Sequence, residues 1–233
     1  MIDRQVSVKR NIVEQTLMNV KDYIRAHQSI VVKITIVSGI VLFLIIAGIV
    51  FCDYKINKET ADFEAVLEEY RNTYTLDEIQ KQEKFKRTVN KLGSIVDSSY
   101  FGYVHKNGYY IIASLYFNEK DYSNAVKYYE KAYRHCSPLF APLALQQAGI
   151  ACEYINNIDE ALRYYLLCES KYNTSYNNDQ ILFNIGRMYS LKGEYFKARE
   201  YFTKVTVEFP QSVFAKRAMQ YGMFLGAIES GQK

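Results

Sequence analysis

Side chains that commonly carry out chemistry are few in this sequence of 233 residues, and their spacing fits no familiar site. There are three histidines and four cysteines: His27, His105, His135, Cys52, Cys136, Cys152 and Cys168. The cysteines stand 84, 16 and 16 residues apart, which matches neither paired CxxC zinc ligands nor a disulfide framework. There is no P-loop, no GxGxxG, no HExxH and no strand-to-helix nucleophile turn. We therefore expect no catalytic residue, metal ion or cofactor, and no small-molecule substrate.

One adjacent pair of reactive types, His135 and Cys136, is a weak candidate for a thiolate site. Neighbouring residues on a helix point in different directions, and Cys136 falls at the end of a predicted helix. Cys152 and Cys168 fall at positions that should pack inside a helical stack, so core packing explains them better than reactivity. The sequence thus predicts a protein that is not an enzyme.

The net charge of +4 is concentrated near the N-terminus. Residues 1–33 carry six basic and three acidic side chains, which leaves a net charge of only +1 for the rest of the chain. Nucleic-acid-binding domains need a strong basic field, and none remains here. No nucleic-acid partner is expected.

An uncharged apolar run of 19 residues, Ile34 to Cys52, predicts a single membrane span within residues 29–53. As a helix the run is roughly 28 Å long, close to the hydrocarbon thickness of a bilayer. A buried core helix would show a polar face, and a cleaved signal peptide would not follow 33 residues of leader. A lipid-modified Cys52 is a further alternative, but Phe51 occupies the place where a lipobox needs a small residue.

The distribution of lysine and arginine predicts the orientation of this span. The basic residues before it are Arg4, Lys9, Arg10, Lys21, Arg25 and Lys33. Those within twenty residues after it are Lys55, Lys58 and Arg71, and they are mixed with six acidic residues. Positive charge favours the cytoplasmic side, so the N-terminus should be cytoplasmic and the C-terminal domain periplasmic.

Two regions flank the span. Residues 1–28 form a cytoplasmic arm, either an amphipathic helix on the anionic leaflet or a solvated, partly disordered segment. Residues 54–105 should form two connector helices, with Thr75 as the N-cap of the second.

Residues 106–233 contain three similar segments at about 106–138, 142–173 and 179–210, followed by a capping helix at 211–228. They align on Ala125, Ala161 and Ala198, which are 36 and 37 residues apart. Small or aromatic residues recur at matching positions around these alanines: Ala113, Tyr116, Tyr129, Gly149, Cys152, Tyr165, Gly186, Tyr189, Phe202 and Pro210. Close crossing of two helices requires the small residues, and we expect the aromatic rings to fill the space between repeats.

This pattern resembles the tetratricopeptide family, most strongly in the third segment. That segment carries Leu182, Gly186, Tyr189, Gly193, Tyr195, Ala198, Phe202 and Pro210 in register. The resemblance implies an all-α fold in which an N-terminal transmembrane helix precedes a stack of helical hairpins with a C-terminal capping helix. The chain also has 22 tyrosines, more than packing requires. We expect a partner or peptide groove at Tyr109, Tyr110, Tyr154 and Arg187, although the tyrosine surplus is equally explained by compositional bias.

The order of arm, span, connector and stack resembles the YfgM-type ancillary subunit of the bacterial SecYEG translocon. The similarity runs through NVKDYIRAHQSIVV, DFEAVLEEY and YIIASLYFNEKDYSNAVKYYEKA. It implies a non-catalytic inner-membrane protein that binds translocon subunits, periplasmic chaperones or unfolded clients during protein export. The third repeat also resembles repeats of the Tol-Pal coordinator and of the outer-membrane assembly lipoprotein, which would imply a role in envelope assembly. A generic membrane scaffold is a third alternative.

Overall fold

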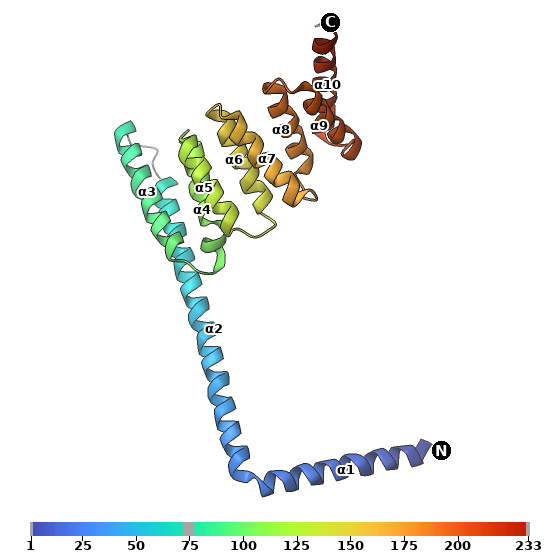
Figure 1. Cartoon of the computed structure of the whole chain (residues 1–233). Coiled ribbons are helices and arrows are strands. Elements are labelled where there is room, and N and C mark those ends of the chain that lie inside the picture. The colour runs from blue at the N-terminus through green and yellow to red at the C-terminus, as the bar shows by residue number, and fades with distance from the viewer. Residues whose placement is uncertain (1, 72–76, 232–233) are drawn as a thin grey trace. The chain divides into compact units, whose positions relative to one another are not determined.

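The computed structural model describes residues 2–71 and 77–231, and the side chains of residues 14–71 and 77–228. The described residues form ten α-helices and no strand, which confirms the predicted all-α class (Figure 1). The chain divides into two compact units, residues 1–55 and residues 56–233.

The first unit contains α1 (Ile2–Ala26) and the beginning of α2 (Gln28–Arg71). The two helices meet at His27, whose ring stacks on Tyr23 with the centroids 4.6 Å apart. Among the described residues, α2 is the helix that is long and apolar enough to cross a membrane, and its apolar stretch is entirely unburied. An apolar N-terminal helix of this kind serves as a membrane anchor or as a signal sequence.

The second unit begins with the end of α2, which packs with α3 (Glu78–Ser98) and α4 (Gly102–Asn118) around one apolar cluster. Phe63 and Leu67, four residues apart on α2, enter this cluster because a helix presents such pairs on one face. The N-cap of α3 is Asp77, whose carboxylate accepts the backbone N–H of Gln80 at 2.8 Å. This corrects the expected cap at Thr75, which lies outside the described residues.

A stack of three hairpins follows (Figure 1). The remaining helices are α5 (Tyr122–His135), α6 (Ala141–Tyr154), α7 (Ile158–Tyr172), α8 (Asn178–Leu191), α9 (Tyr195–Glu208) and α10 (Val213–Gly231). The hairpins are α4–α5, α6–α7 and α8–α9, and each helix packs against the next one along the chain. The last helix, α10, packs on α9 and also contacts α8, so it takes the capping position.

The three hairpin turns share one geometry. A residue in the left-handed region occurs in each, with φ of 60° at Lys120, 57° at Asn156 and 76° at Gly193. These residues all lie five positions before the aligned alanines. In each turn the next residue's N–H bonds the carbonyl five positions earlier at 2.9 Å: Asp121 to Tyr116, Asn157 to Cys152 and Glu194 to Tyr189. The turn geometry therefore repeats independently of side-chain identity.

Glycines on the first helix of a hairpin allow the second helix to approach closely. A Cβ added at Gly149 would lie 2.5 Å from the ring of Tyr165, and one at Gly186 would lie 2.6 Å from the ring of Phe202. Each ring therefore packs within its own hairpin, whereas the sequence pattern suggested packing between hairpins. Phe202 also reaches the next helix, since its ring lies 5.5 Å from that of Tyr221 on α10.

The residues expected at packing positions fall into three groups. Those that are buried are Ala113, Ala125, Tyr129, Gly149, Cys152, Ala161, Tyr165, Gly186, Ala198 and Phe202. Tyr116 and Tyr189 are half-buried and stack on tyrosines of the paired helix, with centroids 5.2 Å and 5.6 Å apart. Pro210 is exposed directly after α9, where it follows the end of the helix rather than packing inside the stack.

Candidate functional site

The cysteine thiols of the stack are placed for packing. Cys152 and Cys168 are buried on α6 and α7, and the Cys168 thiol points to the carbonyl of Pro142 at 3.6 Å. Burial raises the pKa of Cys152 to about 11 and that of Cys168 to about 12. Because the thiolate is the nucleophile and the metal-binding form, such thiols are inert at neutral pH.

His105 and His135, the two histidines of the second unit, contact each other and backbone carbonyl groups. The rings of His105 and His135 meet edge to face with centroids 5.8 Å apart. Each ring contacts a carbonyl through Nδ1, that of Ser99 at 2.8 Å for His105 and that of Lys131 at 2.8 Å for His135. No group of three or more histidine, cysteine or acidic side chains gathers among the described residues in a way that could hold a metal ion.

The surface of the stack offers a different kind of site, a hollow between α6 and α8. It has a volume of about 360 Å³ and is lined by Ile150, Glu153, Tyr154 and Arg187. All four residues come from the first helix of a hairpin. The hollow combines one apolar, one aromatic and two charged side chains, which is a composition suited to protein contacts.

Glu153 organises the polar side of this hollow, which we call the α6–α8 site. Its carboxylate accepts from Arg187 Nη2 at 2.5 Å and Nη1 at 3.3 Å, and from the Tyr165 hydroxyl at 2.6 Å. Burial, followed by the charge of Glu153, raises the pKa of Tyr165. Arg187 also donates to Asn184 at 3.1 Å, so its guanidinium is already engaged on two sides. A ligand carboxylate would have to compete with Glu153 for Arg187.

Tyr154 forms the exposed aromatic part of the α6–α8 site. Its side chain is 61% exposed, yet its ring packs against two other aromatic rings. It stacks on Tyr122 with centroids 4.5 Å apart and planes 12° apart, and Phe117 meets it edge-on at 5.4 Å. A pre-ordered ring of this kind offers contact area at a low entropic cost.

Tyr110 lines a second hollow of about 610 Å³, between the end of α2 and α4. Tyr70 of α2 also lines it and donates its hydroxyl to Glu119 at 2.6 Å. The pKa of Tyr110 is raised to about 12 by burial and then by the neighbouring Tyr129 and Tyr176. The α2–α4 hollow is therefore rich in tyrosine.

Tyr109 lies in neither hollow. Its hydroxyl donates to Asp97 of α3 at 2.5 Å, and its ring lies 5.0 Å from that of His135 and beneath Lys131. Burial and Asp97 together raise its pKa to about 12. Among the four groove residues predicted from the sequence, the structure brings together Tyr154 and Arg187 and places the two adjacent tyrosines in separate environments.

Sequence reasoning missed three important residues: Glu153 and Tyr70, which line the hollows, and Tyr122, on which Tyr154 stacks. Glu153 lies 34 residues from Arg187, and no periodic signal links the two. Tyr122 follows the turn residue Asp121, but Tyr195 holds the equivalent position in the third hairpin, so no distinctive sequence signal marks Tyr122. Tyr70 lies before the second unit's repeats begin, so repeat alignment could not find it.

A stack of helical hairpins with shared turns is the architecture of tetratricopeptide repeats, a fold that in general serves as a scaffold for protein–protein interaction. Two segments match models described as tetratricopeptide repeat, residues 107–134 and residues 180–212. The hairpin between them, α6–α7, shares their turn geometry.

The solved structure of YrrB supports the same fold. YrrB, described as a TPR protein with an unusual peptide-binding site, is 14% identical and superposes with a TM-score of 0.51 over 78% of this chain and 85% of its own. MamA 41-end from Desulfovibrio magneticus RS-1 is 16% identical, with a TM-score of 0.45 over 65% of this chain and 78% of its own. A search of curated proteins found no match.

Proposed function

We propose that this protein is a non-catalytic, membrane-anchored scaffold that serves protein export, as an ancillary translocon subunit or a partner of periplasmic chaperones. The observation that carries the proposal is the change in burial along the apolar helix α2. Its apolar stretch has no buried residue, whereas Phe63 and Leu67 near its end are buried in the first cluster of the repeat unit. One helix thus supplies both a segment suited to lipid and part of the repeat core.

The proposed domain plan assigns each part of the chain to one compartment. Residues 1–28 form a cytoplasmic arm and residues 29–53 the single span. Residues 54–105 form the connector and residues 106–233 the periplasmic stack. The excess of lysine and arginine before the span supports this orientation.

The α6–α8 site supports binding of protein segments rather than of a fixed small ligand. Tyr154 is exposed and pre-ordered, while Arg187 is held by Glu153. Contacts to such a site depend on shape and apolar area more than on a ligand's charge. This suits partner surfaces or unfolded clients whose sequences vary.

Co-purification from mild detergent tests the export role. We expect translocon subunits to accompany the wild-type protein and to be reduced by Tyr154→Ala. The matched control is Phe101→Ala, because Phe101 is also an exposed aromatic residue, at 68% compared with 61% for Tyr154. Recovery of outer-membrane assembly proteins alone would argue for the envelope-assembly alternative and against export.

A labelling experiment tests the orientation separately. A tag placed after Lys233 should react with a membrane-impermeant reagent added to spheroplasts. A tag before Met1 should react only after the inner membrane is permeabilised. Reaction of the C-terminal tag only after permeabilisation would show that the charge-based orientation is wrong.

A further inference from the structure

Helix α10 occupies the place of the first helix of a fourth hairpin. It packs on α9 and reaches α8, in the same succession as the earlier helices. Its Gly222 lies 36 residues after Gly186, which itself lies 37 residues after Gly149. The glycine position of the repeat is therefore present on α10.

The environment of this third glycine differs from that of the other two. At Gly149 and Gly186, an aromatic ring of the second helix covers the glycine so closely that an added Cβ would lie 2.5 Å and 2.6 Å from ring atoms. At Gly222, an added Cβ would meet no heavy atom within 4 Å. In the described part of the chain, the aromatic ring of a second helix is missing from this slot.

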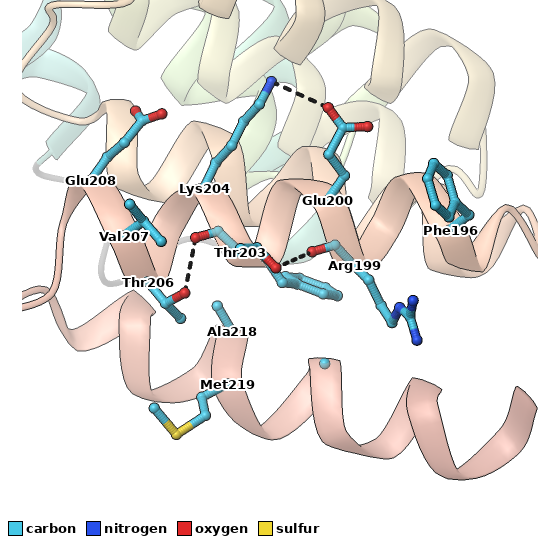
Figure 2. Close-up of a pocket in the computed structure, with 12 residues that line it drawn as sticks. Phe196, Arg199, Glu200, Thr203, Lys204, Thr206, Val207, Glu208, Ala218 and Met219 are labelled. Carbon is cyan, nitrogen blue, oxygen red and sulfur yellow. Dashed lines mark hydrogen bonds and ion pairs between the residues drawn. The ribbon is translucent and has the colours of Figure 1, made fainter. Parts of the chain in front are cut away.

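A hollow of about 690 Å³ lies between α9 and α10 (Figure 2). This is the groove that the second helix of a fourth hairpin would fill. Phe202, Ala218 and Gly222 line it, together with Met219. Phe202 and Ala218 are themselves buried at 2% and 0% exposure, so they form a fixed floor. The equivalent groove one repeat earlier lies between α7 and α8. There the next helix, α9, packs on α8 and covers Gly186.

Several polar groups around the α9–α10 hollow already have partners within α9. Thr203 donates its hydroxyl to the Arg199 carbonyl at 2.9 Å, and Thr206 donates to the Thr203 carbonyl at 2.9 Å (Figure 2). Lys204 pairs with Glu200 at 3.9 Å. An occupant therefore needs no charged group to satisfy this surface, and apolar contact dominates.

The apolar surface continues beyond the hollow. Met219, Met223 and Phe224 on α10 are 54%, 66% and 65% exposed, and Phe196 and Val207 on α9 are also largely exposed. Terminal helices of repeat stacks normally show a polar outer face, because an apolar one lowers solubility. Clustered exposed apolar residues instead mark an interaction surface, and flexible methionines adapt to a partner.

We propose that the α9–α10 hollow binds an amphipathic helix of a partner protein, which completes a fourth hairpin. The earlier second helices define what this helix must carry: a small residue, an aromatic residue four positions later and a small apolar residue three positions after that. In this chain the pattern occurs as Ala125-Tyr129-Ala132, as Ala161-Tyr165-Cys168 and as Ala198-Phe202-Val205. The partner's aromatic ring packs on Gly222.

A second copy of this chain is a poorer occupant. The helices that carry the required pattern, α5, α7 and α9, have these residues buried at 2% exposure or less within their own hairpins. They would have to leave their own stack to bind. The proposal is independent of the export role and of the α6–α8 site.

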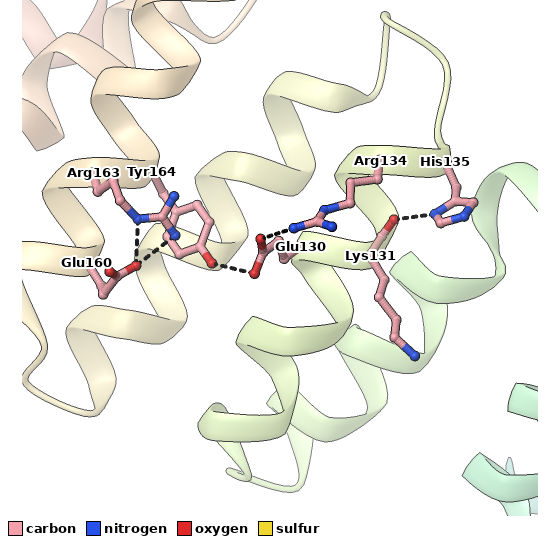
Figure 3. A network of polar contacts seen from close by, with 7 residues as sticks. All are labelled: Glu130, Lys131, Arg134, His135, Glu160, Arg163 and Tyr164. Atoms are coloured by element: carbon pink, nitrogen blue, oxygen red, sulfur yellow. Dashed lines mark hydrogen bonds and ion pairs between the residues drawn. The ribbon is translucent and has the colours of Figure 1, made fainter.

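Polar contacts between successive second helices show how the bound helix is further held. Tyr164 on α7 donates its hydroxyl to Glu130 on α5 at 3.2 Å (Figure 3). Arg163 stacks over the Tyr164 ring at 4.2 Å and pairs with Glu160 (Figure 3). Glu200 and Glu208 line the α9–α10 hollow, although at other repeat positions than Glu130, so a hydroxyl of the bound helix would find a carboxylate there.

Titration with a surrogate helix tests the proposal. The probe is a fluorescent peptide with the sequence of Tyr195–Glu208, which carries the required pattern. Its binding to the full chain in nanodiscs is followed by anisotropy. We expect saturable binding that weakens at least tenfold for Gly222→Val, for Met219→Glu, and for a peptide in which the phenylalanine equivalent to Phe202 is alanine. Gly93→Val is the matched control, because Gly93 is also a helical glycine with nothing within 4 Å, and it should bind as wild type.

The outcomes separate the possible occupants. Equal binding by wild type and Gly222→Val, or no saturable binding, would overturn the proposal. Sedimentation equilibrium provides a second readout. If the wild-type chain alone self-associates and Gly222→Val dissociates it, the face belongs to a second copy, which also overturns the assignment to a partner helix. Circular dichroism of each variant checks that helix content is unchanged.

Discussion

Replacing Gly186 with alanine is expected to destabilise the stack, although alanine is the better helix former. The new methyl group would lie 2.6 Å and 2.8 Å from two ring atoms of Phe202. Phe202 has little room to move, since it is 2% exposed and packs against Phe183 and Tyr221 with centroids 5.7 Å and 5.5 Å away. Overpacking of this kind costs about 1–3 kcal/mol.

Gly222→Ala serves as the reference that separates the cost of overpacking from the gain in helix propensity. Both glycines lie inside helices at equivalent repeat positions, so alanine gains about 0.5–1 kcal/mol of helix propensity at each. Only Gly186 has a ring within contact distance. The difference in unfolding free energy between the two variants should therefore equal the overpacking cost, about 1–3 kcal/mol. For a unit of this size the difference corresponds to about 2–12 °C in Tm.

Thermal and urea unfolding of the full chain in nanodiscs, followed by circular dichroism, measures this difference. Gly222→Ala should raise Tm slightly above that of the wild type. The Tm of Gly186→Ala should be lower than that of Gly222→Ala. Combining Gly186→Ala with Phe202→Leu should recover part of the loss by making room for the methyl group. If Gly186→Ala stabilised the chain as much as Gly222→Ala does, the close packing of Gly186 on Phe202 would be refuted.

Three further substitutions or treatments test other parts of the structure. Gly193→Ala should cost about 1 kcal/mol, because φ is 76° there and left-handed backbone is unfavourable for residues with a Cβ, and urea unfolding would show it. Arg187→Met should destabilise by about 1–3 kcal/mol by leaving the 17%-exposed Glu153 carboxylate without its cation, and Glu153→Gln in the same background should restore part of the loss in a double-mutant cycle. Cys152 and Cys168 should resist alkylation at pH 8 until the chain unfolds, as mass spectrometry can test. Because burial raises their pKa to about 11 and about 12, their contribution to stability is complete below pH ~8.5 and is lost as the pH rises through these values.

Composition and local spacing were sufficient to predict the elements of this fold. An uncharged apolar run such as Ile34 to Cys52 is stable as a helix that is out of contact with water. The position of the predicted span therefore follows from the sequence alone. The recurrence of Ala125, Ala161 and Ala198 reflects a steric need at each helix crossing, and that need repeats with the hairpin. Such features depend on residues close in sequence, which is why one sequence predicts them.

Tertiary structure decided which side chains meet across the hairpins. Tyr109 and Tyr110 are neighbours in sequence, yet one bonds Asp97 and the other lines the α2–α4 hollow, because adjacent helix positions face different partners. Arg187 was expected to be available to a ligand, but Glu153, 34 residues away, occupies it. Gly222 matches the other repeat glycines in sequence, and only the fold shows that no ring covers it. Contacts between residues distant in sequence depend on how whole helices pack, and that information is not contained in local spacing.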